Sequence, residues 1–324
     1  MKKKTKAIFA SVLFVCAAAL AVLIYRAEKS EPAVEDSGTS PTKEKYTDLV
    51  YNGEKYTYRS GLETVLFLGI DNFGETESSN VYINFGQADF IMVAVINNVE
   101  KTYSLIQINR DTMCKIPVLG VGGKVAAYEV MQLALAHTYG SGMEDSCENT
   151  VRAISHFLAG VPIDHYLSMN MDGVGVLNDS VGGVTVTVLD DFADEPRLKK
   201  GETVKLEGDL ALTYVRGRMD TAQGTNTSRM ERHRQYIEAY LKQLDNRLDS
   251  TDFVANTFYQ VAEYMVTDMS VTQLSSIADA ITEYEFTGIY TPEGESVFGG
   301  EYMEFYADTK SLEKLIVENF YRKK

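Results

Sequence analysis

The chain has 324 residues, of which 45% are hydrophobic and 24% charged, a composition that excludes an intrinsically disordered protein. The net charge is −15, and four lysines with no acidic residue fall in residues 1–24, so the other 300 residues carry a net charge of −19. Because general nucleic-acid binding needs a basic face, we expect no nucleic-acid partner, and any anion must meet a local group of arginines.

The N-terminal segment has the pattern of a membrane anchor. Four lysines within residues 1–6 precede residues 7–24, which are uncharged and almost wholly apolar. As a helix rising 1.5 Å per residue, this run spans about 27 Å, enough for the core of a bilayer. The lysines predict a cytoplasmic N-terminus and an extracellular body on a single-pass cell-membrane protein. A cleaved signal peptide is the alternative, and we favour the anchor because the apolar run is long.

The segments on either side of the anchor carry no predicted domain. The cytoplasmic tail of six residues is too short for a DNA-binding domain, which excludes direct transcriptional control by this chain. Residues 27–45 are polar and contain two prolines, a pattern typical of a linker. We assign residues 25–60 to an extracellular linker.

Three strands are predicted early in the body. Residues 64–70 form a buried apolar run that ends at Asp71, and residues 72–86 read as a loop. Residues 90–97 and 102–108 are separated by a short turn, so these two strands should form a hairpin.

Helices and strands then alternate without internal repeats, which indicates the α/β class, with a mixed central β-sheet flanked by helices. Cys114 and Cys147 could form one disulfide bridge or remain free buried thiols. The expected elements are helices at 124–139 and 144–159, a strand at 165–170, a short helix at 172–179, a strand at 184–189, helices at 207–215 and 229–246, and then two helices, a short strand at 286–290, a loop and a final helix.

The hairpin brings acidic residues together. Asp89 immediately precedes the second strand, whereas Arg110 and Asp111 immediately follow the third. If the first strand runs parallel to the third, Asp71 ends at the same edge of the sheet, where open α/β sheets commonly bind ligands. Two carboxylates suit Mg²⁺ bound together with phosphate oxygens. The alternative is that each aspartate only closes a loop.

Arginines are concentrated in one short interval, at positions 216, 218, 229, 232 and 234. Ser228 and Glu231 fit a capping box, which predicts a helix beginning at Arg229. Cations at a helix N-terminus oppose the macrodipole unless an anion binds there, and arginine forks suit phosphate oxygens. The alternative is a solvated basic face, but the interval contains only two acidic residues, Asp220 and Glu231.

Eight segments in this order resemble the LytR-CpsA-Psr family. The similarity covers about residues 61–245, which we assign to a catalytic domain, and residues 246–324 resemble a C-terminal extension found in some members. The segments are VLFLGID (65–71), QADFIMVAVIN (87–97), SLIQINRDT (104–112), the stretch from Lys124 to Gly142, GVPIDHYLSMN (160–170), LNDSVGGVTVTV (177–188), LEGDLALTYVRGR (206–218) and SRMERHRQ (228–235).

The resemblance implies an activity. Members of that family are phosphotransferases of Gram-positive cell envelopes, and they move a glycopolymer such as wall teichoic acid or capsular polysaccharide from a polyprenyl-pyrophosphate carrier to peptidoglycan. It implies Mg²⁺, or Mn²⁺ in its place, on Asp71 and Asp89, and an apolar tunnel for the lipid that the sequence does not locate. We expect Asp89 to accept the proton of the attacking hydroxyl and Asp111 to orient Arg110. The residues implied to face the pyrophosphate are Gln87, Arg110, Arg216, Arg218, Arg229 and Arg232.

The chain departs from the family pattern at three positions. Gln87 replaces an arginine, Asn109 replaces a proline, and Arg234 occupies a place usually held by glutamine. One lost charge-assisted contact weakens phosphate binding by about 1.5–3 kcal/mol, which Arg234 could offset. Two alternatives to the transferase therefore stay open: a non-catalytic polyprenyl-phosphate binding protein and a polyprenyl-pyrophosphate hydrolase.

Overall fold

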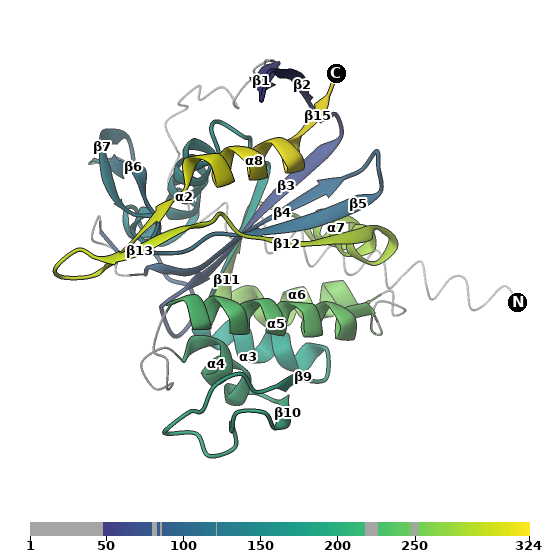
Figure 1. Ribbon diagram of the computed structural model, residues 1–324. Coiled ribbons are helices and arrows are strands. Elements are labelled where there is room, and N and C mark those ends of the chain that lie inside the picture. The colour runs from purple at the N-terminus through teal and green to yellow at the C-terminus, as the bar shows by residue number, and fades with distance from the viewer. Residues whose placement is uncertain are drawn as a thin grey trace, which may run out of the picture. The chain divides into compact units, whose positions relative to one another are not determined.

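The computed structural model describes residues 48–79, 83–84, 86–120, 122–217, 226–245, 247 and 252–324. Its centre is a six-stranded mixed sheet with the spatial order β11-β8-β3-β4-β5-β12 (Figure 1). The predicted α/β class with a mixed central sheet is confirmed. The strands of this sheet are β3 (Leu62–Ile70), β4 (Ala88–Asn97), β5 (Thr102–Gln107), β8 (His165–Asn170), β11 (Met265–Thr267) and β12 (Glu285–Tyr290).

The strand directions place the chemistry at one edge. β4 is antiparallel to both β3 and β5, so the predicted hairpin forms and β3 runs parallel to β5. β8 pairs parallel with β3, and β12 pairs parallel with β5. Asp71 after β3, Asp89 at the start of β4 and Arg110 after β5 therefore share one edge of the sheet.

Helices cover both faces of the sheet, which Figure 1 shows edge-on. Leu66 and Leu68 pack on one face with Ile154 and Phe320, whereas Val65 points to the other, because successive strand residues face opposite ways. The first face carries η1 (Leu133–Thr138), α2 (Glu144–Phe157) and α8 (Thr309–Phe320). The second carries α3 (Met171–Ser180), α4 (Asp209–Arg216), α5 (Asn226–Asp245), α6 (Phe253–Val261), η2 (Ala262–Tyr264) and α7 (Val271–Glu283).

Smaller sheets surround this core. β15 pairs with β2, so the last strand of the chain completes a sheet begun by the first two. The remaining strands are β1 (Leu49–Tyr51), β2 (Glu54–Tyr58), β6 (Met113–Leu119), β7 (Val125–Gln132), β9 (Val184–Thr187), β10 (Thr203–Leu206), β13 (Gly294–Phe298), β14 (Met303–Ala307) and β15 (Tyr321–Lys323).

The helix predicted over residues 124–139 is wrong. Residues 125–132 form β7, which pairs antiparallel with β6, and only residues 133–138 are helical, as η1. Gly122 and Gly123 have φ values of 84° and 73°, so the connection can turn tightly where other residues would be strained. The pairing with β6 therefore overrides the local helical pattern.

Three predicted boundaries also differ from the structure. Residues 49–58, assigned to the linker, form β1 and β2. The boundary at residue 245 divides the central sheet, because β11 and β12 both follow it. The helix expected to begin at Arg229 begins at Asn226, which puts Ser228 inside the helix and not at its N-cap.

Two further predictions concern the anchor and the cysteines. The anchor predicted at residues 7–24 lies outside the described residues, and within the described part no helix is both long and apolar enough to cross a membrane. Cys114 and Cys147 are both free thiols, so they form no bridge with each other.

Candidate active site

Asp89 occupies a bulge in β4. Gly69 pairs with Phe90 while the next residue, Ile70, pairs with Ala88, so Asp89 is an extra residue opposite β3. A bulge redirects a side chain from the regular alternation of the strand. Gly69 makes this approach possible, because a Cβ there would lie 2.9 Å from the Cβ of Phe90.

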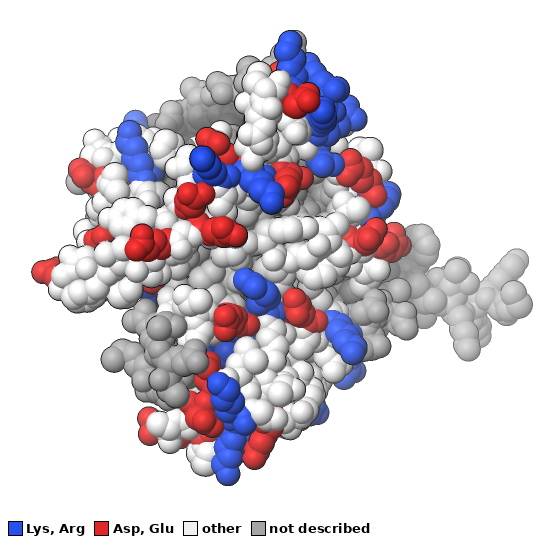
Figure 2. Space-filling view, in the orientation of Figure 1, with Lys and Arg blue, Asp and Glu red and all other residues white. Residues whose placement is uncertain are grey.

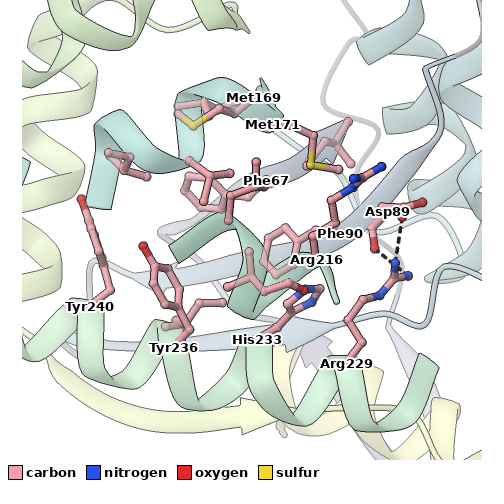
Figure 3. A pocket seen from close by; sticks show the side chains of 18 residues that line it. Phe67, Asp89, Phe90, Met169, Met171, Arg216, Arg229, His233, Tyr236 and Tyr240 are labelled. Carbon is pink, nitrogen blue, oxygen red and sulfur yellow. Dashed lines mark hydrogen bonds and ion pairs between the residues drawn. The ribbon is translucent and has the colours of Figure 1, made fainter. Parts of the chain in front are cut away.

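The Asp89 carboxylate is held by two arginines from distant elements. Arg229, in the first turn of α5, donates from Nη1 to Oδ2 at 2.8 Å, as Figure 3 shows. Arg110, after β5, forms an ion pair with Oδ1 through its own Nη1. The three side chains are only 13%, 3% and 10% exposed, in the order Asp89, Arg229, Arg110. Asp89 already pairs with both guanidinium groups, and little water screens this attraction. An incoming anion must therefore compete with the Asp89 carboxylate for them.

Arg110 is oriented by neutral and acidic neighbours. Gln87 accepts a hydrogen bond from its Nη2 through Oε1. Oδ1 of Asp111 lies 3.3 Å from its Nε, and Gln132 donates to that same Oδ1 at 3.0 Å. Asp111 therefore contacts Arg110 and the end of β7, and Gln87 supplies an acceptor where an arginine would have added a like charge.

Arg216 forms a looser pair at the same edge. It is the last residue of α4, and its Nη2 lies 3.3 Å from Oδ1 of Asp71. Its guanidinium also lies 5.1 Å from the ring centre of Phe73. The Arg216 and Asp71 side chains are 48% and 40% exposed, so solvent screens their attraction. Arg216 can exchange Asp71 for another anion at little cost.

Two other arginines point elsewhere. Arg232 is completely buried, pairs with Asp190 and donates from Nε to the Tyr214 carbonyl at 3.0 Å. These contacts do not support its predicted role against the pyrophosphate, which stays a prediction. Arg234 donates to Thr291 at 3.2 Å and does not line the cavity described next, so it does not replace the charge absent at Gln87. Arg218 lies outside the described residues.

An apolar cavity opens beside this cluster. Its empty space is about 960 Å³, including the part open to solvent. Phe67 and Phe90 line it from the sheet, and Tyr236 and Tyr240 line it from α5, with Tyr240 far from the charged residues in Figure 3. Asp89, Arg216 and Arg229 line the opposite end. The sequence did not locate this cavity, whose walls come from six separate elements.

His233 borders both the cavity and the arginines. It lies 2.8 Å through Nε2 from the Val215 carbonyl and meets the Phe90 ring edge-on at 5.3 Å. Burial lowers the pKa of His233 to about 3, and the nearby Arg229 acts in the same direction. His233 is therefore neutral at physiological pH, and Nε2–H donates to that carbonyl. It ties the end of α4, and with it Arg216, to α5.

Sequence reasoning missed several residues that hold the site together. Asp190, the partner of Arg232, directly follows the predicted strand at 184–189. This position is the only feature of the sequence that indicates a place for Asp190 near the site. Asn226 donates to Asn109 at 2.6 Å, a contact with no signal in the sequence, because 117 positions separate the two.

Surface charge is mixed around these elements. Figure 2 shows Lys and Arg interspersed with Asp and Glu over the face in view. Attraction of an anion therefore depends on the local cluster of Arg110, Arg216 and Arg229 and not on this face as a whole.

The carboxylates fit a magnesium ion only in part. Asp71 donates its backbone N–H to the Gln87 carbonyl at 2.9 Å, so Asp71 and Asp89 lie on adjoining segments. Among the described residues, no group of three or more His, Cys, Asp or Glu side chains could hold a metal. Mg²⁺ is commonly bound by one or two carboxylates plus substrate phosphates. The donor set therefore fits an ion that shares its coordination with a phosphate, and not one held by the protein alone.

Several known proteins are similar to this chain in sequence and in fold. The model of the LytR_cpsA_psr family matches residues 24–318. A protein of Halalkalibacterium halodurans named polyisoprenyl-teichoic acid–peptidoglycan teichoic acid transferase TagU is 32% identical over 181 residues, which cover 56% of this chain and 52% of that protein. The protein of the same name from Enterococcus faecalis is 30% identical over 215 residues, covering 66% and 64%. This chain thus spans between half and two thirds of the length of these relatives.

The fold similarity extends to solved structures. A structure of TagT bound to LI-WTA aligns with a TM-score of 0.58 at 21% identity, covering 80% of this chain and 89% of that one. At this identity the similarity establishes the fold and does not identify the ligand of this chain.

Proposed function

Because the chain belongs to the LytR-CpsA-Psr family, we propose that it is a phosphotransferase that moves a glycopolymer, a wall teichoic acid or a capsular polysaccharide, from a polyprenyl-pyrophosphate carrier to peptidoglycan. The observation that carries this proposal is the junction of an apolar cavity with arginines at one end. A ligand that fits both parts joins a long apolar chain to an anion. The relatives named as teichoic acid transferases support the choice of polymer.

Substrate binding is proposed as an exchange of anions. The pyrophosphate takes the place of Asp89 on Arg110 and Arg229, and of Asp71 on Arg216. The guanidinium forks stabilise the charge that develops on the phosphates during transfer. The polyprenyl chain lies along Phe67, Phe90 and the tyrosines of α5, where its burial adds affinity.

The proposed reaction is one substitution at phosphorus. The oxygen of a peptidoglycan hydroxyl forms a bond to the sugar-linked phosphorus, and the bond from that phosphorus to the bridging oxygen breaks. Polyprenyl phosphate leaves with the bridging oxygen and its electron pair. Asp89, released from its arginines, accepts the hydroxyl proton. Mg²⁺ or Mn²⁺ shared by Asp71, Asp89 and the phosphates would supply further charge neutralisation.

We also propose that residues 7–24 anchor the protein in the cell membrane with the body outside. The apolar run and the preceding lysines support this placement, which puts the site in the compartment of peptidoglycan.

The test uses full-length protein in detergent with a polyprenyl-pyrophosphate glycan and peptidoglycan oligomers. Mass spectrometry follows polyprenyl phosphate and the glycan–peptidoglycan conjugate, with Mg²⁺ and with a chelator. We expect conjugate with Mg²⁺, and its loss in Arg216→Ala. Arg197→Ala is the matched control, because Arg197 is 64% exposed and pairs with Glu195 outside the site.

The products separate the alternatives. Free glycan phosphate without conjugate would identify a hydrolase. Bound lipid without turnover would identify a carrier-binding protein. Either result would refute the transferase.

A further inference from the structure

We propose that Asn109 and Asn226 form a clasp that sets the distance between the two arginines on Asp89, so that both arginines bind two oxygens of one phosphate group of the substrate. Both are positioning residues that act through Arg110 and Arg229. The inference rests on the proposed function only in taking these arginines as pyrophosphate ligands.

Asn109 fixes the loop that follows β5. It is 4% exposed and immediately precedes Arg110. Its Oδ1 accepts from the backbone N–H of Asp111 at 2.9 Å, and its own carbonyl accepts from the Thr112 hydroxyl at 2.6 Å. The side chain therefore closes a tight turn around Arg110.

The same Oδ1 reaches a second element. It accepts from Nδ2 of Asn226, the first residue of α5, at 2.6 Å. Oδ1 of Asn226 in turn accepts from Nη2 of Arg229 at 2.7 Å. One contact between two amides thus joins the turn that carries Arg110 to the helical turn that carries Arg229.

This connection suits a ligand that spans two cations. Arg110 and Arg229 hold different oxygens of one carboxylate, so their separation matches a bidentate anion. A phosphate group presents pairs of oxygens at nearly the spacing of a carboxylate, so it engages both arginines only if that separation is kept. Fixing the two guanidinium groups before binding removes an entropy cost that a flexible pair would bear. A proline at position 109, as in the family pattern, has no side-chain acceptor and could not form the clasp.

The test measures the affinity of the full-length protein for inorganic pyrophosphate and for inorganic phosphate by calorimetry. Asn226→Ala breaks the clasp and leaves the turn at Asn109 intact. Asn109→Ser breaks the clasp and keeps a hydroxyl that can accept from Asp111. We expect Asn109→Ser to bind each anion about fivefold more weakly, the effect of one lost hydrogen bond, and Asn226→Ala to bind at least as weakly, because it also loses the contact with Arg229. The double variant should be no weaker than Asn226→Ala alone, since that variant already lacks the contact that Asn109→Ser breaks.

Asn98→Ala is the matched control. Asn98 is also bound through both ends of its amide, to Glu63 and Tyr284, but at the opposite end of the β4–β5 hairpin. We expect no change in either affinity. Unchanged affinity for both anions, or additive losses in the double variant, would overturn the clasp while leaving the proposed function intact. A wild-type protein that binds no pyrophosphate would overturn both.

Discussion

Arg229 and Asp89 are joined by a hydrogen bond of 2.8 Å, although 140 positions separate them in the chain. With Arg110 on the other carboxylate oxygen, the contact fastens the first turn of α5 to the bulge in β4. The two arginines therefore already face an anion that the protein itself supplies.

Replacing Asp89 by asparagine should destabilise the protein. Asp89→Asn removes a carboxylate charge that pairs with two buried guanidinium groups, and we expect the free energy of unfolding to fall by about 3–5 kcal/mol. Inorganic pyrophosphate should restore more of this stability than it adds to the wild type, because it supplies the missing charge. Urea denaturation with and without pyrophosphate measures both effects. Asp71→Asn is the control, since its half-exposed pair with Arg216 is worth at most about 1 kcal/mol. Equal losses in the two variants would contradict the assignment.

Arg232 should prove structural. Arg232→Ala leaves the Asp190 carboxylate buried and unpaired, so unfolding should become easier by about 3–5 kcal/mol. Removing both charges, in Arg232→Met with Asp190→Leu, should recover much of that loss. Denaturation in guanidinium chloride gives the stabilities, and calorimetry gives the pyrophosphate affinity of the folded protein. That affinity should stay near the wild-type value, and a tenfold loss in the folded double variant would return Arg232 to the binding site.

Stability should depend on pH through His137. Burial lowers the pKa of His137 to about 4, whereas an unfolded histidine titrates near 6.5. As the pH falls from about 6.5 to 4, the unfolded chain takes up a proton that the folded chain excludes. The free energy of unfolding then decreases by up to about 1.4 kcal/mol per pH unit from this one group. Denaturation of His137→Gln over this range should show a free energy of unfolding that changes less steeply with pH, by the equivalent of about one bound proton. Measurement at pH 7.5 isolates the effect of lost packing, and parallel curves throughout would refute the prediction.

Gly69→Ala should distort the bulge. The added Cβ would lie 2.9 Å from the Cβ of Phe90, so the strands must separate or Phe90 must move. We expect a loss of about 1–3 kcal/mol in the free energy of unfolding, together with weaker binding of a polyprenyl phosphate in a fluorescence titration. Gly175→Ala, in the middle of α3 with its new Cβ no closer than 3.4 Å to other atoms, is the comparison. A Gly69→Ala protein with wild-type stability and lipid affinity would show that the close approach is unimportant.

The predicted hairpin correctly placed Asp89 and Arg110 at one edge of the sheet, because a hairpin depends only on strands that are adjacent in sequence. The strands at 90–97 and 102–108 are adjacent in sequence, so Asp89 and Arg110 had to meet once the turn formed. Arg232 could not be assigned in this way. It follows Arg229 by three residues, and at 100° per residue the two side chains leave the helix about 60° apart. That angle directs Arg229 to Asp89 and Arg232 to Asp190, and only the packing of α5 reveals it.

Contacts between distant segments account for the other errors. The pattern at 124–139 is compatible with a helix, and the alternative depends on β6 being available as a pairing partner. The contact of Asn109 with Asn226 joins positions 117 apart and depends on how α5 packs beside the end of β5. Neither partner could be identified from its neighbours in the chain.

The pairing of β15 with β2 has a consequence for how the protein is made. Arg59, next to β2, donates to the carbonyl of Tyr321, 262 positions later, so this small sheet cannot close until the chain has been synthesised as far as β15. Until then one edge of β2 remains unpaired, and such an edge invites pairing with another chain. A nascent or truncated molecule lacking residues 321–324 would keep that edge open. Synthesis of β15, more than assembly of the central sheet, would then end the exposure of this edge to aggregation.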